Sequence, residues 1–111
     1  MAALLYPQSF LPAAPQLWST NCVWSTGGWG VDSPAVSEDG TVYVGALTNG
    51  GDGGAHATLF SFGADGRTNW SLSLWGSRVC RAPAVCEDGT VYIGSSATNV
   101  YNYAEFYAVN P

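Results

Sequence analysis

The chain has 111 residues and a formal net charge of −5, with no lysine and only three arginines. Binding to nucleic acid or to an anionic membrane surface needs a basic patch, so we expect neither kind of partner. Fourteen glycines and 15 aromatic side chains (5 Trp, 6 Tyr and 4 Phe) stand beside only 11 charged residues (three basic and eight acidic). This composition favours an all-β protein of short strands and tight turns.

Residues 1–15 form the first segment of the chain. They carry no positive charge, and Pro7, Pro12 and Pro15 interrupt their short apolar run. The segment therefore fits neither a signal peptide nor a transmembrane helix. We predict a loose N-terminal leader, and the sequence leaves the cellular compartment unknown.

The stretch 16–25 predicts a kinked β segment, because two short polar and apolar runs each contain a tryptophan (Trp18 and Trp24). Trp18-Ser19 and Trp70-Ser71 each precede a copy of the repeat described next. We therefore interpret 16–25 as the last strand of a preceding four-stranded unit.

A 13-residue segment occurs in two closely similar copies, at Ser33–Gly45 and at Ala82–Gly94. Pro34 and Pro83 lie 49 positions apart (83 − 34), and the other paired residues keep the same offset. A period of this size is typical of propellers, solenoids and repeat arrays. The architecture is therefore a repeated one.

Each copy of this segment predicts a hairpin, because its Asp-Gly pair supplies the positive φ that a tight connection between two strands needs. In the first copy a glycine-rich loop at 48–56 follows the hairpin, and two further strands come after the loop. The strands we predict are Pro34–Ser37, Thr41–Ala46, Thr58–Phe62 and Arg67–Leu74, and then Pro83–Cys86, Thr90–Gly94 and Glu105–Val109.

Four consecutive antiparallel strands joined by tight turns make one propeller blade. We therefore predict a partial β-propeller of about two four-stranded blades over residues 16–111. It would contain the last strand of one blade, a full blade at about 33–74, and three strands of a second blade at about 82–109.

The repeat resembles that of pyrroloquinoline-quinone-type (quinoprotein-like) β-propellers. The resemblance rests on Ser33–Val36, Asp39–Gly45, Leu59–Phe62, Asp65-Gly66 and Trp70, and it continues in the second copy through Phe106–Asn110. It covers about residues 16–111 and implies that the shared motif positions are structural. Those positions are Pro34, Asp39, Gly40, Tyr43, Gly45, Gly66, Trp70, Pro83, Asp88, Gly89, Tyr92 and Gly94.

The same resemblance implies that Trp70 docks between neighbouring blades, against the turn glycine Gly66 and the small residue Ser61. Ala108 takes the place of Ser61 in the second copy. Gly63 departs from the family pattern, which usually has an acidic residue or Asn there, and Asn110 restores that pattern in the second copy.

The strand at 41–46 is hydrophobic on both faces, with Val42 and Val44 on one and Tyr43 on the other. Such a strand is covered on both sides. Two blades alone leave faces and strand edges open to water. We therefore expect a protein partner or further propeller blades, with self-association as one way to supply them.

Four candidate sites carry little chemistry. The loop at 50–56, with Asp52, lacks the acidic spacing of a calcium loop and the lysine of a P-loop. His56, the sole histidine, lies in a glycine-rich stretch that gives a general base no rigid support. The pairs Glu38-Asp39 and Glu87-Asp88 recur at the same turn, which favours turn chemistry and solubility over an active site.

Cys22, Cys80 and Cys86 are odd in number and form no CxxC motif, so a disulfide framework or a zinc site has little support. We predict small, buried, reduced thiols, which favour a reducing compartment.

We expect no catalytic, cofactor-binding or metal-binding residues. The leading hypothesis is a non-catalytic propeller module that serves as a scaffold or protein-interaction surface. The alternative is a fragment of a quinoprotein dehydrogenase, and under that alternative the resemblance implies pyrroloquinoline quinone and calcium at the propeller axis. A truncated reading frame without independent function is a third hypothesis.

Overall fold

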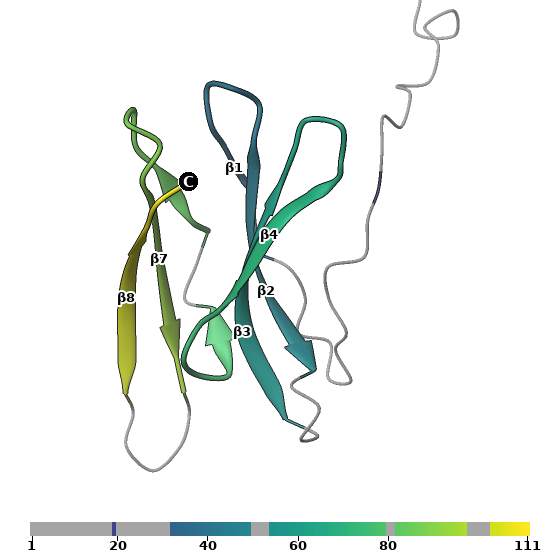
Figure 1. Ribbon diagram of the computed structural model, residues 1–111. Helices are drawn as coiled ribbons and strands as arrows, with labels where there is room; N and C mark the ends of the chain where they lie inside the picture. Colours follow the sequence, from purple (N-terminus) through teal and green to yellow (C-terminus); the bar gives the residue numbers. More distant parts are fainter. Residues whose placement is uncertain (1–18, 20–31, 50–53, 80–81, 98–102) are drawn as a thin grey trace, which may run out of the picture.

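The computed structural model describes residue 19 and residues 32–49, 54–79, 82–97 and 103–111 (Figure 1). These residues form eight β-strands and no helix, so the predicted all-β class is confirmed. The strands make two antiparallel sheets that pack face to face (Figure 1). The leader at 1–15 lies outside the described residues, and so does the predicted strand at 16–25 apart from Ser19.

Sheet 1 is an antiparallel meander of four strands in chain order. Its strands are β1 (Ala35–Val36), β2 (Val42–Asn49), β3 (Ala55–Phe62) and β4 (Thr68–Ser73). β2 and β3 form its centre, and their register pairs Tyr43 with Ser61. The hairpin predicted at Asp39-Gly40 is confirmed, because β1 pairs antiparallel with β2.

Sheet 2 is built around one strand, β7 (Val91–Ser96). The strand β8 (Ala104–Val109) pairs with every residue of β7. Two short strands, β5 (Arg78–Val79) and β6 (Ala84–Val85), pair with opposite ends of β7. Because β8 occupies one whole edge of β7, the two short strands share the other edge.

Two sequence predictions about strands need correction. β2 runs on to Asn49 and β3 begins at Ala55, so the ends of the predicted loop at 48–56 are paired strand residues. His56 in particular lies on β3, opposite Thr48, and is not part of a flexible glycine-rich loop. The two-residue strand β5 was not predicted, because its pairing depends on contacts with the distant β7.

Three turns of the chain share one hydrogen-bond pattern. In the first, the Ser37 N–H donates to the Thr41 carbonyl (2.9 Å), and the Gly40 N–H donates to the Ser37 carbonyl (3.0 Å). The Asp39 carboxylate accepts the Thr41 N–H (2.9 Å). The same three bonds recur in the turns 63–67 and 86–90. An aspartate occupies the third position of each turn because its carboxylate accepts the N–H of the residue two positions later.

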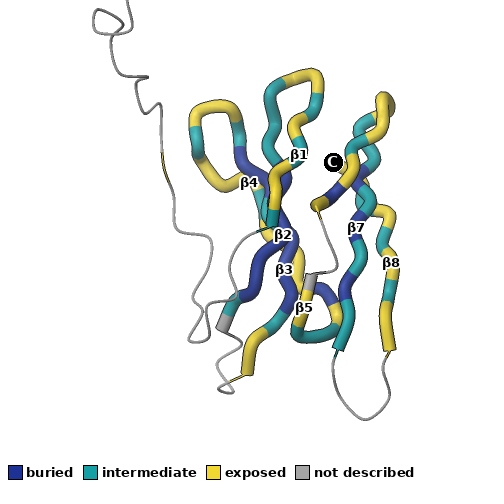
Figure 2. The backbone as a smooth tube through the Cα atoms, turned by 180° about the vertical axis from the view of Figure 1, so that it is seen from behind, coloured by how far each residue is buried: buried dark blue, intermediate teal, exposed yellow. Residues whose placement is uncertain are grey.

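The core lies between the two sheets, where the buried positions of β2, β3 and β7 gather (Figure 2). In each sheet we distinguish two faces by their central residues. The tyrosine face consists of Tyr43, Ala57, Leu59 and Ser61 in sheet 1, and of Tyr92, Ala104, Phe106 and Ala108 in sheet 2. The valine face consists of Val42, Val44, Ala46, Phe60 and Phe62 in sheet 1, and of Val91, Ile93, Ser95, Tyr107 and Val109 in sheet 2.

The tyrosine face of sheet 1 packs against the valine face of sheet 2. Leu59 and Val91 are fully buried in one cluster, and Tyr43 and Ile93 are exposed by only 2% and 1%. Trp70 and Val85 pack at the border of this cluster. The two sheets therefore meet through non-equivalent faces, the tyrosine face of one and the valine face of the other.

The registers of the two sheets identify matched positions. Leu59 lies opposite Gly45 in sheet 1, and Phe106 lies opposite Gly94 in sheet 2. These two side chains occupy the same place in their sheets, yet Leu59 is 0% exposed and Phe106 is 75% exposed. Their environments differ because sheet 2 covers the tyrosine face of sheet 1.

This matched pair gives a stability prediction. We expect Leu59→Ala to cost about 2–5 kcal/mol of unfolding free energy, because it removes a buried side chain and leaves a cavity. We expect Phe106→Ala to change the same quantity by less than about 0.5 kcal/mol at low protein concentration, because this side chain is largely solvated. Urea unfolding followed by tryptophan fluorescence measures both values. Equal losses in the two variants would contradict the assignment of the two faces.

Candidate functional site

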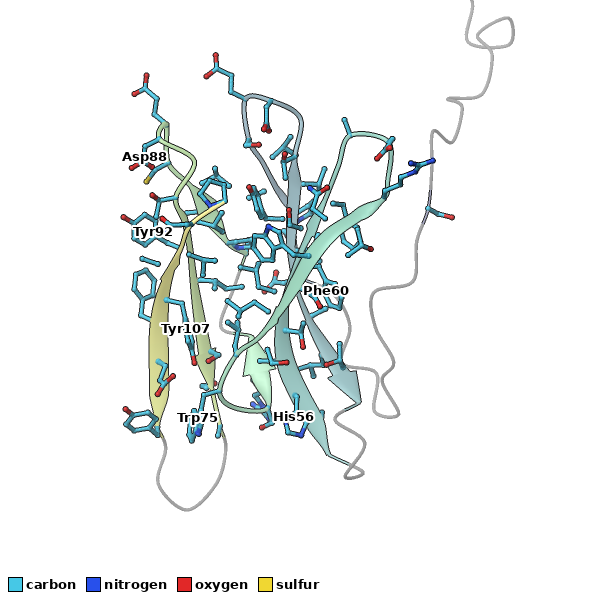
Figure 3. The ribbon with its side chains drawn as sticks, viewed as in Figure 1. His56, Phe60, Trp75, Asp88, Tyr92 and Tyr107 are labelled. Atoms are coloured by element: carbon cyan, nitrogen blue, oxygen red, sulfur yellow. The ribbon has the colours of Figure 1, made fainter. Side chains whose placement is uncertain are left out.

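Two hollows lie between the sheets, at opposite ends of the molecule. The first, which we call the acidic cleft, has a volume of about 450 Å³ and is bounded by the turns at 37–41 and 86–90. The second, which we call the connector pocket, has a volume of about 440 Å³ and lies beside the chain segment that joins the sheets. Figure 3 shows Asp88, which lines the acidic cleft, near one end of the molecule. His56 and Trp75, which line the connector pocket, lie near the other end.

The acidic cleft owes its charge to the repeated turn. Its lining residues are Val36, Ser37, Glu38, Asp39, Tyr43, Val85, Cys86, Glu87, Asp88, Gly89 and Pro111. Four of them are acidic and none is basic. Tyr43 and Val85 supply apolar walls from the two sheets. The cleft therefore combines apolar walls with an acidic rim.

The aspartates of the rim are held ionised by the turns themselves. The hydroxyl of Ser37 donates to the Asp39 carboxylate, and this bond is the main reason that the pKa of Asp39 falls from its ordinary 3.8 to about 2. The Thr41 N–H lowers the pKa further. In the second turn the Thr90 N–H lowers the pKa of Asp88 in the same way. Both carboxylates therefore remain charged at neutral pH.

These carboxylates do not assemble a metal site. Within the ranges that the structure describes, no three His, Cys, Asp or Glu side chains come close enough together to hold a metal ion. The oxygens Asp39 Oδ1 and Asp88 Oδ1 already accept turn N–H groups. The acidic rim can attract cationic groups, but it has no preformed coordination geometry.

The connector at 74–77 joins the sheets through hydrogen bonds to both. On the side of sheet 1, the Leu74 N–H donates to the Ala57 carbonyl (2.8 Å), and the Ala57 N–H donates to the Gly76 carbonyl (2.9 Å). On the side of sheet 2, the Tyr107 hydroxyl accepts the Trp75 N–H (2.8 Å). The Ser77 N–H donates to the Ser96 carbonyl (3.0 Å), and the Ser95 hydroxyl donates to the Trp75 carbonyl. The connector is thus a backbone bridge between sheets.

Tyr107 lies at the centre of this bridge. Its hydroxyl accepts from Trp75 and donates to the Glu105 carboxylate. Burial, followed by the hydrogen bond to Glu105, raises the pKa of the Tyr107 phenol. The hydroxyl therefore keeps its proton and can fill both roles at neutral pH.

The structure brings together two of the predicted motif residues most directly. The rings of Tyr43 and Trp70 lie 5.9 Å apart between centroids, and Trp70 pairs with Ser61 across β3 and β4. The positive φ values of Gly40, Gly66 and Gly89 (86°, 84° and 88°) form the three turns. Pro34 and Pro83 precede the short strands β1 and β6, Asp39 and Asp88 cap turns, and Tyr92, Gly45 and Gly94 lie within the central strands.

One prediction about the cysteines is wrong. Cys86 is free, as expected, but it is exposed at the acidic cleft and not buried. Cys86 has the same position in the second turn that Ser37 has in the first, and the Cys86 side chain is exposed to solvent. Cys22 and Cys80 lie outside the described residues.

Sequence reasoning missed the connector and the aromatic surface beside it. Trp75 meets Tyr103 edge-on, with ring centroids 4.9 Å apart and an interplanar angle of 83°. Tyr107 contacts Trp75 across 32 positions of sequence. A second tryptophan shortly after Trp70 was the one available signal, and it does not reveal a partner so distant in the chain.

Comparisons with models of known protein families, with curated proteins and with solved structures found no match for this chain. Among the residues whose structure is described, no helix is long and apolar enough to cross a membrane.

The connector gives a prediction about glycine. Gly76 and Gly40 both have a positive φ (101° and 86°). A Cβ at Gly76 would lie 2.6 Å from the Ser96 carbonyl oxygen, whereas at Gly40 it would lie 3.3 Å from the Ala64 Cβ. We expect Gly40→Ala to lower the unfolding free energy by about 1–2 kcal/mol, mainly through backbone strain, with the tight contact to the Ala64 side chain as a smaller cost. Gly76→Ala adds a clash with fixed backbone, so we expect a clearly larger loss in urea unfolding. A smaller loss at Gly76 would contradict the bridge.

The first turn gives a prediction about pH. The folded-state pKa of Asp39 is about 2, below its ordinary 3.8, so its ionised form stabilises the folded chain. That contribution is complete above about pH 4 and is lost as the pH falls towards 2. We expect Ser37→Ala, which removes the main cause, to raise the Asp39 pKa towards 3.8 in an NMR titration. Asp88 serves as the internal control, and a shift of both aspartates, or of neither, would contradict this cause.

Proposed function

We propose that this chain is a non-catalytic β-propeller module that serves as a scaffold or protein-interaction surface, and that its two sheets are neighbouring blades. The observation that carries the proposal is the contact between the tyrosine face of sheet 1 and the valine face of sheet 2. Propeller blades are four-stranded antiparallel sheets repeated around an axis. Repetition around an axis always sets one face of a blade against the opposite face of the next.

The repeat itself supports this reading of the contact. The 49-residue offset relates Tyr43 to Tyr92 and Val42 to Val91. Tyr43 and Val91 nevertheless lie on the two sides of the same interface, because the faces in contact are opposite ones. A sandwich of two sheets that joined equivalent faces would have placed Tyr43 near Tyr92 instead. The contact therefore favours a repeating stack over a closed pair.

The surface supports an interaction role. Two aromatic side chains are exposed at separate places on or beside sheet 2: Phe106 on its tyrosine face is 75% exposed, and Tyr103, just before β8, is 53% exposed and contacts Trp75. Apolar surface of this kind, rimmed by polar residues, marks contact sites on proteins. At one end of the molecule the acidic cleft adds four carboxyl side chains, which favour partners with positive charge.

The experiment that tests the proposal is a quinone titration. We expect the chain, mixed with pyrroloquinoline quinone and excess calcium, to retain no stoichiometric cofactor after desalting, as judged by quinone absorbance. We also expect no dye-linked oxidation of alcohols. A known quinoprotein apoenzyme treated in parallel is the positive control. Stoichiometric binding by this chain would overturn the scaffold proposal in favour of a quinoprotein dehydrogenase.

A further inference from the structure

Sheet 2 is one strand short along the outer edge of β8 (Figure 1). In sheet 1, β3 pairs with β2 on one side and with β4 on the other. Among the strands that the structure describes, only β7 pairs with β8. About half of the N–H and C=O groups of an antiparallel strand point towards each neighbour, so β8 directs such groups to an open edge. An open edge of this kind is a template for an added strand.

The matching edge in sheet 1 shows what kind of strand fits there. The registers of the two sheets place Ala108 of β8 at the position that Ser61 has on β3. The residue opposite Ser61 on β4 is Trp70. Ser61 is 1% exposed, whereas Ala108 is exposed. The strand opposite Ser61, with its tryptophan, therefore supplies cover that Ala108 lacks.

A small residue in the middle strand lets two large rings meet across it. Tyr43, Ser61 and Trp70 lie in a row across three adjacent strands. The rings of Tyr43 and Trp70 approach to 5.9 Å between centroids over the small side chain of Ser61. Tyr92 and Ala108 repeat the first two members of this row in sheet 2. A ring opposite Ala108 on an added strand therefore completes the row.

The open edge of sheet 2 is also more aromatic than its counterpart. Phe106 is 75% exposed and stacks on Tyr92, with centroids 5.9 Å apart and planes 14° from parallel. The matched position in sheet 1 holds Leu59. We call Tyr92, Phe106 and Ala108 the edge slot. Because aromatic rings pack favourably on one another, the edge slot favours an aromatic side chain, and tryptophan offers the largest ring.

Glu105 adds a negative charge to the same edge. It takes the position of Thr58, whose partner on β4 is Ser73, three residues after Trp70. The Glu105 carboxylate accepts the Tyr107 hydroxyl, and a carboxylate has capacity for further donors. Oppositely charged side chains that face each other across strands stabilise the pairing. A basic residue three positions after the tryptophan therefore complements this edge.

We infer that the outer edge of β8 binds an extended, tryptophan-bearing segment of a partner protein. The segment pairs antiparallel with β8, places its tryptophan opposite Ala108 against the ring of Tyr92, and carries a lysine or arginine opposite Glu105. In strand addition the main-chain hydrogen bonds provide affinity, and the pockets for alternate side chains provide specificity. The inference rests on the proposed function, because it names the partner of a protein-interaction module.

Calorimetric titration of the full chain with a synthetic peptide tests the inference. The probe has the sequence of Arg67–Leu74, the segment that pairs with β3, and carries the change Ser73→Lys. We expect saturable 1:1 binding, and we expect Trp70→Ala in the peptide to weaken it at least about tenfold, because the ring that fills the edge slot is lost. A peptide that retains Ser73 should bind more weakly at low salt, and salt should reduce this difference.

Variants of the chain locate the bound peptide. Ala108→Glu should weaken binding at least about tenfold, because it fills the edge slot with a charged side chain. Ala64→Glu is the matched control: it adds the same charge at an exposed turn of sheet 1 and should leave binding unchanged. Glu105→Gln should remove only the advantage of the lysine peptide. Circular dichroism of each variant must match that of the parent chain.

A measurement on the parent chain needs no variant. In two-dimensional NMR spectra, the amide resonances of β8 should shift on addition of the peptide, and those of β4, the outer strand of sheet 1, should not. Shifts confined to β4 would contradict the inference.

Four further outcomes would overturn it. These are a peptide that does not bind, equal binding by the Trp70→Ala peptide, equal binding by the Ala108→Glu chain, and sedimentation of the chain alone as a dimer that Ala108→Glu dissociates. The last outcome would assign the edge to a second copy of the chain. The quinone titration remains a separate test: a chain that binds neither quinone nor peptide ends the inference alone, and a chain that binds both ends the scaffold proposal alone.

Discussion

The contact between the tyrosine face of sheet 1 and the valine face of sheet 2 is the interaction on which the rest of the structure depends. Each sheet alone is small, and isolated hairpins are marginal in water without a covered apolar face. Leu59 and Val91 are fully buried because the two sheets cover each other. The connector at 74–77 adds hydrogen bonds to both sheets, so it fixes the distance and register at which the faces meet.

The repeat separates what a local sequence determines from what its neighbours determine. Asp39 and Asp88 lie in turns with identical backbone bonds, because an aspartate that accepts the N–H two residues later needs only its own five-residue segment. Tyr43 and Tyr92 have nearly identical neighbours, with Ile93 in the place of Val44, yet Tyr43 is buried and Tyr92 is only half-buried. Burial here depends on the contact between the two sheets, whereas turn geometry depends only on the repeated segment itself.

The same distinction explains how much could be predicted from the sequence. The hairpins at Asp39-Gly40 and Asp88-Gly89 and the main strands follow from turn chemistry and from β-branched and aromatic residues. The strand position of His56 could not be predicted, since glycines flank it and its pairing with Thr48 depends on how far the hairpin extends. Of the candidate site, the acidic turns could be predicted from the sequence. The connector could not, because it depends on a contact between distant residues. The exposure of Phe106 could not be predicted either, because it depends on which face of each sheet the other sheet covers.

The acidic turns also oppose the contact between the two sheets. Hydrogen bonds hold the Asp39 pKa at about 2 and lower that of Asp88, so these carboxylates cannot escape mutual repulsion by taking up protons near neutral pH. Repulsion at an exposed rim is weak and screened by salt, whereas apolar burial contributes roughly 25 cal/mol for each Å² removed from water. The contact between the two sheets is therefore held by their apolar faces, and the charged turns at its edge weaken it only slightly.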